Sequence, residues 1–353
     1  MAEGVVGCVF QCEMKGVFMN IRERIEKEEL EYLSPYASAS IRSRGRARQE
    51  TECDIRTVYQ RDRDRILHCK AFRRLKDKTQ VFLSPQGDHY RTRLTHTLEV
   101  SQISRTVARA LSLNVDLVEA IALGHDLGHT PFGHAGERAL DAFCPGGFYH
   151  NKQSIRVLNF LENDGRGLNL TWEVLDGIEN HQLSTNPSTL EGQVVRLCDK
   201  IAYIHHDMDD AQRAGMISED DIPITVRMVL GFNLKQRLDK LVHDMIENSL
   251  GKNQIEMSDE VDHAMKMLRR LMYEDVYKNE LAKSEEAKVA LIMEIMFDYY
   301  NDGPEHLPEK YQKMIIDGHA KERVACDYIA GMTDQFCIRK FKEIYIPEAW
   351  DIY

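Results

Sequence analysis

The chain has 353 residues, and its 46 Lys and Arg against 57 Asp and Glu give a net charge of −11. With 43% hydrophobic and 29% charged residues, the composition is typical of one or two soluble globular domains and excludes extensive disorder. No apolar run is long enough to span a membrane and no secretion leader is evident, so we expect a cytoplasmic protein without membrane contact. The eight Cys residues form no CxxC pair, which fits reduced thiols.

The charge is unevenly distributed along the chain. Residues 42–93 contain 15 Lys and Arg against 7 Asp and Glu, a net charge of +8, whereas the remainder carries −19. A basic segment on an acidic protein indicates either a local site for an anionic ligand or a solvated surface. Nucleic-acid binding by the whole surface is disfavoured, because the acidic remainder would repel phosphate.

Helical periodicity dominates the sequence, and strand-like alternation is rare. The N-terminal 40 residues are interrupted by Ser34-Pro35 and by a run of small polar residues, so we expect partial flexibility there. Apolar stripes then predict helices in this order: from His96 to Leu111, from Leu117 to a break at Gly124, from Leu190 to Ile201, and over about 225–249, 259–278, 284–300 and 319–345. We therefore predict an all-α fold with an N-terminal arm (1–54), a catalytic core (55–215) and a helical C-terminal region (216–353) packed on that core.

A group of His and Asp residues indicates a metal centre. His125-Asp126 closes an apolar helical stripe, and His96 lies on the apolar face of the preceding helix, so these side chains point inward. Burying them is costly unless they are paired or bind a metal ion. Asp199 begins a polar stripe with Tyr203 and Asp207 at i+4 and i+8. Two His and two Asp suit a divalent cation; the alternative is a set of hydrogen-bonded polar groups in the core.

The order of these residues resembles the H…HD…D pattern of the HD-domain phosphohydrolases. Residues 91–100 (RTRLTHTLEV) and 124–137 (GHDLGHTPFGHAGE) are similar to motifs of the deoxyguanosinetriphosphate triphosphohydrolase branch, as are residues 73–82 and 148–154. These motifs span about 60–210, over 40% of the chain. The chain thus resembles dGTPases and related dNTP triphosphohydrolases.

The resemblance implies an HD-domain helical fold with additional C-terminal helices. It also implies metal-dependent hydrolysis of dGTP or other dNTPs to deoxynucleoside and tripolyphosphate, in control of the dNTP pool. One divalent metal ion per subunit (Mg, Mn, Fe, Co, Ni or Zn) is implied. The implied metal ligands are His96, His125, Asp126 and Asp199; the catalytic pair is the acid His134 with its partner Glu137; and the substrate-binding residues are Gln80, Arg93, His129, His150, Lys200, Tyr203 and Asp207.

The resemblance also implies partners beyond the dNTP substrate. Members of the family form homo-oligomers, often hexamers, several are activated by dNTPs at subunit interfaces, and some bind single-stranded DNA. The basic run Arg42 to Arg48 could serve such a partner or could be a solvated arm. Base preference, native metal, activator and oligomer size stay open.

Two alternative functions remain at this point. An HD phosphomonoesterase or phosphodiesterase is compatible with the metal ligands, although the pattern of Gln80, Lys200 and Tyr203 argues against it. A regulatory nucleotide- or single-stranded-DNA-binding protein with a structural HD site is the other. His134 and Glu137 argue against that second alternative, because a site without turnover needs no proton donor.

Overall fold

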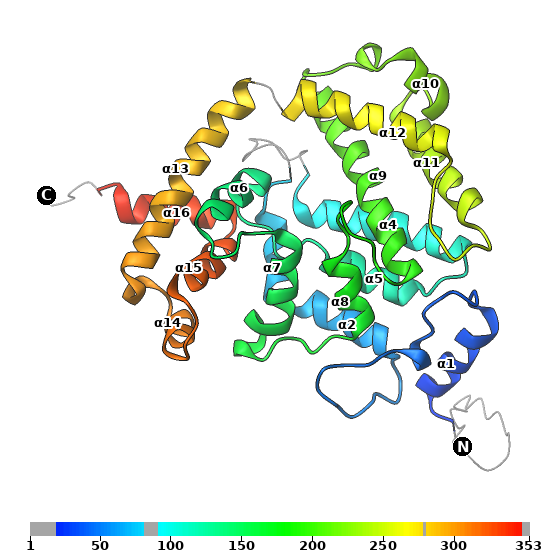
Figure 1. The fold of residues 1–353 in the computed structure, drawn as a ribbon, viewed down its shortest axis with the longest axis horizontal. Coiled ribbons are helices and arrows are strands. Elements are labelled where there is room, and N and C mark those ends of the chain that lie inside the picture. Colours follow the sequence, from blue (N-terminus) through cyan, green and yellow to red (C-terminus); the bar gives the residue numbers. More distant parts are fainter. Residues whose placement is uncertain (1–18, 81–90, 278–279, 348–353) are drawn as a thin grey trace, which may run out of the picture.

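The molecule is built from α-helices (Figure 1). The computed structural model describes residues 19–80, 91–277 and 280–347, and within these ranges only two isolated β-bridges accompany the helices. The all-α prediction is therefore confirmed. In the described part of the chain, no helix is both long and apolar enough to cross a bilayer.

Sixteen α-helices occur in the described ranges. Their bounds are α1 Ile21–Tyr32, α2 Val58–His68, α3 Lys70–Arg74, α4 Arg93–Ala110, α5 Val115–Gly124, α6 Gly133–Phe143, α7 His150–Arg156, α8 Trp172–Glu179, α9 Leu190–Arg213, α10 Ile224–Leu230, α11 Leu234–Ser249, α12 Asp259–Met272, α13 Glu280–Asp302, α14 Glu309–Ile316, α15 Lys321–Ala330 and α16 Asp334–Tyr345.

Two of the predicted helical stretches are each divided into two helices. The stretch 225–249 breaks at Gly231, whose φ of 112° lies in the left-handed region that ends α10. The stretch 319–345 breaks after Ala330, and the side chain of Thr333 then caps α16 by accepting a hydrogen bond from the Phe336 amide. Apolar spacing alone does not reveal these breaks, because both helices of each pair pack on the same core.

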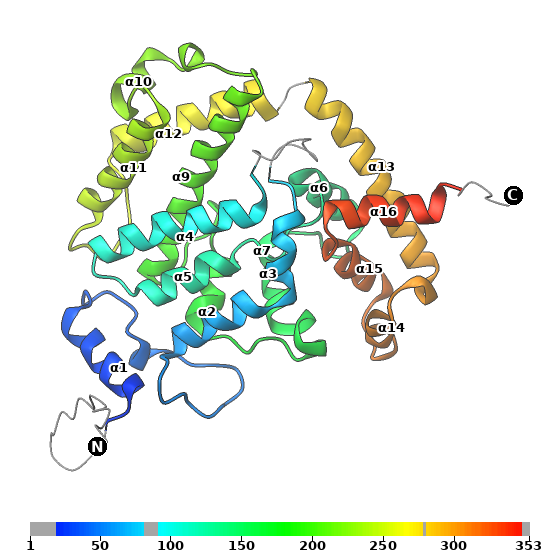
Figure 2. The same cartoon turned by 180° about the vertical axis from the view of Figure 1, so that it is seen from behind.

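Helices α4, α5 and α9 pack against one another in the middle of the molecule (Figures 1 and 2). Their apolar stripes are buried, as the periodicity predicts, with Val100, Val107, Ile121 and Ile201 fully inaccessible to solvent. The group α10–α12 lies at one end of the molecule and α13–α16 at the other. Helix α6 contacts both α13 and α15, so the C-terminal helices support the segment that carries His134 and Glu137.

The N-terminal segment is attached to the core from α1 onward. Both the amide and the hydroxyl of Ser40 donate hydrogen bonds to buried Glu29. The guanidinium of Arg46 is buried against the carboxylate of Asp62, and Arg44 lies 3.8 Å from the ring centroid of Trp172. Within the run 42–48, Arg44 and Arg46 therefore bind groups of the core and are not part of a solvated arm. Residues 1–18 lie outside the described residues.

Candidate active site

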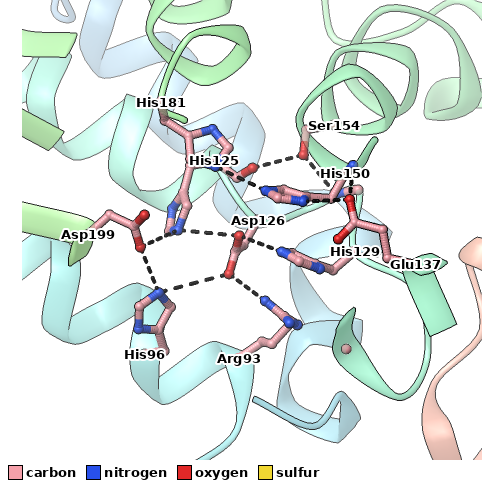
Figure 3. A network of polar contacts seen from close by, with 12 residues as sticks. Arg93, His96, His125, Asp126, His129, Glu137, His150, Ser154, His181 and Asp199 are labelled. Carbon is pink, nitrogen blue, oxygen red and sulfur yellow. Dashed lines mark hydrogen bonds and ion pairs between the residues drawn. The ribbon is translucent and has the colours of Figure 1, made fainter. Parts of the chain in front are cut away.

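Four side chains from three helices converge in the interior (Figure 3). His96 projects from α4, His125 and Asp126 follow the end of α5, and Asp199 comes from α9. The Nε2 atom of His96 lies 3.1 Å from Asp199 Oδ1 and 3.9 Å from Asp126 Oδ2. The Nε2 atom of His125 lies 3.4 Å from Asp126 Oδ1 and 3.6 Å from Asp199 Oδ1. The structure thus brings together all four residues predicted to bind the metal.

The hydrogen bonds of His125 show that this cluster suits a cation. Its Nδ1 atom lies 2.7 Å from the carbonyl oxygen of Ala122, which can only accept, so Nδ1 carries the proton. Nε2 then presents a lone pair toward two carboxylates, and it has no hydrogen-bond partner among the described residues. A buried lone pair facing carboxylate oxygens is unfavourable unless a cation lies between them. Two imidazoles and two carboxylates form a ligand set that divalent transition-metal ions, including Mn²⁺, accept.

The electrostatics of the same cluster also favour a bound positive charge. Burial disfavours the charged imidazolium of His125, but Asp126 and Asp199 outweigh this effect and raise its pKa to about 9. Burial opposes ionisation of Asp126 as well, yet His125, His129 and Arg93 hold its pKa well below the usual range. The carboxylates therefore stay ionised and attract either a proton or a metal ion.

Asp126 is held in place by two further residues of the predicted site. Arg93 Nη1 donates to Asp126 Oδ2 at 2.8 Å, and His129 Nε2 lies 3.1 Å from Asp126 Oδ1. Arg93 is only 2% exposed, so its guanidinium is buried beside the Asp126 carboxylate. Both Arg93 and His129 lie beside the predicted metal ligands, and their contact with phosphate stays a prediction.

The predicted acid and its partner lie on the first turns of α6. His134 Nδ1 is 3.2 Å from Glu137 Oε2, and the imidazole is 67% exposed. The other oxygen of Glu137 accepts from both the amide and Nδ1 of His150, each at 2.8 Å. Burial opposes ionisation of Glu137, but hydrogen bonds from His134 and His150 hold its pKa far below the ordinary value. An ionised carboxylate thus orients an accessible imidazole.

His129 lies between this pair and the cluster of His96, His125, Asp126 and Asp199. Its ring stacks on that of His150 with centroids 3.9 Å apart, and its centroid lies 5.5 Å from that of His134. A tight turn separates His129 from α6, in which Phe132 and Gly133 both have positive φ. This turn brings the chain back so that the His134 ring lies near the His129 ring. A Cβ atom on Gly133 would meet the carbonyl oxygen of Gln80 at 3.2 Å. Gln80, the last described residue before residue 91, therefore lies against the start of α6.

The remaining predicted substrate residues lie on α9 with Asp199. Lys200 is largely buried, its ammonium donates to the Arg196 carbonyl oxygen at 3.2 Å, and burial lowers its pKa to about 8. Tyr203 is half-buried and Asp207 is buried. Asp199, Tyr203 and Asp207 share one side of α9, as the i, i+4, i+8 spacing predicts.

The structure also places three residues at the site that the sequence analysis did not single out. His181 Nε2 lies 3.2 Å from His150 Nε2, and the His206 ring lies 5.8 Å from that of His96. The buried ammonium of Lys78 donates to the carbonyl oxygens of His129 and Ala330. His181 ends the apolar stripe of α8 in the way that His125 ends that of α5, so the same signal could have identified it.

Two families of known domains match this chain. The HD domain matches residues 93–204, which include the four clustered residues. The phosphohydrolase-associated domain matches residues 255–343 in the C-terminal region.

Curated relatives align with almost the whole chain. A deoxyguanosinetriphosphate triphosphohydrolase-like protein of Caldanaerobacter subterraneus subsp. tengcongensis is 55% identical over 94% of this chain and 98% of the relative. Proteins with the same description from Clostridium perfringens and Geobacter sulfurreducens are 48% and 38% identical, over 94% and 89% of this chain and 99% and 95% of theirs. A solved structure of a hypothetical protein from Aquifex aeolicus, 19% identical over 80% of this chain and 71% of its own, has a TM-score of 0.46.

Proposed function

Because the chain belongs to the deoxyguanosinetriphosphate triphosphohydrolase-like family of HD-domain proteins, we propose that it hydrolyses deoxynucleoside triphosphates to deoxynucleoside and tripolyphosphate. The observation that carries this proposal is the proximity of two chemical groups. A two-His, two-Asp cluster lies next to the accessible His134–Glu137 pair, with the His129 ring between them. Hydrolysis of a phosphate ester needs both stabilisation of negative charge and a proton for the leaving oxygen.

In this proposal His96, His125, Asp126 and Asp199 hold one divalent metal ion. When bound, the ion supplies Lewis-acid stabilisation of negative charge on a phosphoryl oxygen. Arg93 and His129 keep Asp126 in position through hydrogen bonds to its two oxygens. Elemental analysis of the purified protein would identify the ion among Mg, Mn, Fe, Co, Ni and Zn.

His134 is the proposed proton donor. As water adds to the α-phosphorus, the bond from phosphorus to the 5′-oxygen breaks, and the imidazole of His134 protonates that oxygen. Glu137 orients the ring through its Oε2 atom, which lies 3.2 Å from His134 Nδ1. The two hydrogen bonds from His150 fix Glu137, so that its second oxygen stays directed at His134.

The remaining predicted residues are proposed to bind substrate. We assign the polyphosphate to Arg93, His129, His150 and Lys200, which offer cationic or N–H donor groups beside the cluster. We assign the deoxyribose to the polar groups of three residues: Gln80, Tyr203 and Asp207. Tyr203 packed on the sugar would leave no room for a 2′-hydroxyl and so select against ribose.

The family membership supports further proposals about the working state of the protein. We propose a cytoplasmic homo-oligomer that takes part in dNTP pool control. A dNTP activator at subunit interfaces and single-stranded DNA are the proposed additional partners. Among arginines of the 42–48 run, Arg44 and Arg46 are already engaged with the core, so these partners would need other groups.

A product analysis tests the proposed reaction. Each of the four dNTPs, singly and in mixtures, is incubated with the purified protein and Mg²⁺ or Mn²⁺, and the products are separated by anion exchange. Tripolyphosphate in equal amount to deoxynucleoside is the expected result. Orthophosphate alone would instead indicate a phosphomonoesterase, and no turnover with any dNTP or mixture would favour a regulatory binding protein. Activity in mixtures only would reveal an activator.

A further inference from the structure

One buried carboxylate of the C-terminal region binds two segments of the candidate active site. Asp334 is the first residue of α16 and is 3% exposed. Its Oδ1 atom accepts a hydrogen bond from the amide of Phe132 at 2.9 Å. Its Oδ2 atom accepts from the amide of Thr79 at 3.0 Å and also from the Thr79 hydroxyl. Both oxygens thus join α16 to segments that lie 202 and 255 residues earlier in the chain.

The first of these segments is the turn that leads into the proposed proton donor. Phe132 precedes α6, whose second residue is His134. The φ of Phe132 is 63°, in the left-handed region that residues with a Cβ atom rarely occupy. Such a conformation persists only where the surrounding contacts favour it. The bond from the Phe132 amide to Asp334 is such a contact, because an amide at the N-cap has no acceptor within its own helix.

The second segment, residues 78–80, lies against this turn. A Cβ atom on Gly133 would lie 3.2 Å from the carbonyl oxygen of Gln80 and 3.6 Å from that of Thr79. The amide of Arg93 donates to the carbonyl oxygen of Lys78 at 3.1 Å, so the segment also contacts the start of α4. The carboxylate therefore fixes the start of α6 relative to a segment that is itself bound to the core.

A further buried side chain joins the same turn to the C-terminal region. Lys78 is 3% exposed, and its ammonium donates to the carbonyl oxygen of Ala330 at 2.9 Å and to that of His129. Ala330 is the last residue of α15, and His129 lies three residues before Phe132. The loop from His129 to Phe132 is thus held at both ends by the junction of α15 and α16.

We propose that Asp334 is a positioning residue for the proton donor: it holds the turn before α6 so that the His134 imidazole reaches the leaving 5′-oxygen. This inference rests on the proposed function and gives the C-terminal region a part in turnover. Asp334 acts through the backbone, since it binds the Phe132 amide two residues before His134. A misplacement of about 1 Å lowers turnover by up to about 100-fold.

A double-mutant cycle separates this role from a general loss of stability. In Asp334→Asn one oxygen becomes an NH₂ group, which opposes the donors of either Phe132 or Thr79. We expect kcat for dNTP hydrolysis to fall by roughly 10- to 100-fold with unchanged metal content. In the His134→Ala background the same change should alter kcat by no more than about twofold, because the group that Asp334 positions is already absent. Loss of metal, or an equal loss of kcat in both backgrounds, would overturn the proposal.

Asp244→Asn is the matched control. Asp244 is also buried and accepts from the amide and the hydroxyl of Ser258, each at 2.8 Å, but it joins α11 to the start of α12. This variant should lose stability and keep a kcat close to that of the wild type. A loss of kcat equal to that of Asp334→Asn would show that removal of any such buried carboxylate impairs turnover, and would overturn the positioning role.

A second pair of variants carries the test if Asp334→Asn does not fold. Thr79→Val removes the hydroxyl that donates to Asp334, whereas Thr79→Ser retains it. We expect kcat to fall in Thr79→Val, by less than in Asp334→Asn because the amide of residue 79 still donates, and to stay near the wild-type value in Thr79→Ser. Equal kcat values for the two variants would overturn the proposal.

Hydrogen exchange measured by mass spectrometry tests the same contact without reference to activity. Peptides that cover residues 127–136 should exchange faster in Asp334→Asn than in the wild type and should be unchanged in Asp244→Asn. Unchanged exchange of these peptides in Asp334→Asn would overturn the proposal. If the wild type hydrolyses no dNTP, the proposed function fails, while faster exchange in Asp334→Asn would still show that Asp334 fixes the turn.

Discussion

At the residue scale, two buried carboxylates organise the candidate site. Asp126 receives hydrogen bonds from Arg93 and His129, and Glu137 receives them from His134 and His150. Each carboxylate is thus held ionised by neighbours that also fix its direction. The first is suited to a metal ion and the second to an imidazole that donates a proton.

Replacing Asp126 by alanine tests the first of these roles. We expect Asp126→Ala to lose bound metal and dNTP turnover together, because it removes one ligand and leaves Arg93 and His129 without their acceptor. Metal content by elemental analysis and turnover at saturating substrate are the measurements. Asp220→Ala is a matched control, since the side chain of Asp220 is 95% exposed. Full metal content in Asp126→Ala would contradict the assigned ligand set.

Replacing His134 separates proton donation from metal binding. His134→Ala should keep its metal and lose roughly 100- to 10,000-fold in kcat, the contribution expected of a general acid. Glu137→Gln should show a loss of kcat in the same direction, because it replaces the carboxylate whose Oε2 atom lies 3.2 Å from His134 Nδ1 and orients the ring. Near-normal turnover by His134→Ala would show that another group supplies the proton.

At the element scale, close backbone contact joins the turn after α5 to α7. The amide of Gly128 donates to Ser154 Oγ at 2.8 Å, and the same hydroxyl donates to the carbonyl oxygen of His125 at 2.9 Å. A Cβ atom on Gly128 would lie 2.2 Å from the His150 carbonyl oxygen and 2.2 Å from the Ser154 amide nitrogen. Only glycine allows this approach, which sets the position of His150 relative to His125 and Asp126.

Gly128→Ala therefore tests how closely these elements must fit. We expect α7 to be displaced, kcat to fall by up to about 100-fold, and the free energy of unfolding to drop by about 1–3 kcal/mol as in other overpacked cores. Gly215→Ala is the control, because a Cβ atom on Gly215 would meet no atom within 4 Å and only the positive φ of this residue opposes the change. Equal turnover and equal urea midpoints for the two variants would contradict this account.

At the scale of the whole molecule, the N-terminal segment is secured by a buried ion pair. Arg46 bonds the carboxylate of Asp62, and Asp62 also accepts from the amide and hydroxyl of Thr171. Removing one partner of such a pair costs about 3–5 kcal/mol, because the other charge stays buried. The segment is thus part of the folded unit rather than an appendage.

Arg46→Ala should lower the free energy of unfolding by about 3–5 kcal/mol in urea denaturation. Burial already raises the pKa of Asp62 against the opposing effect of Arg46, and loss of Arg46 raises it further. Folding then takes up a proton, so the loss of stability should be smaller at about pH 5 than at about pH 8. Arg24→Ala, at a site 63% exposed, is the control and should change little. Similar midpoints for both variants would contradict a structural role of the pair.

Much of the site could be predicted because its signals are local. His125 and Asp126 end an apolar stripe, and Asp199 and Tyr203 follow helical spacing, so their helices present them as expected. The contacts of His181 with His150 could not be predicted, since they depend on how the end of α8 meets α7. The ion pair of Arg46 with Asp62 could not be predicted either, because the two residues become partners only when the N-terminal segment folds onto α2.

The sequence by itself determined the helical content, the order of the predicted metal ligands and the spacing of the proposed acid and its carboxylate partner. These properties depend on residues three or four positions apart, which a helix places on one face. The tertiary structure decided which histidines share a carboxylate and which arginines are buried. Those outcomes depend on packing between helices that are distant in the chain, where side-chain volume and backbone approach at glycine, rather than local spacing, set the distances.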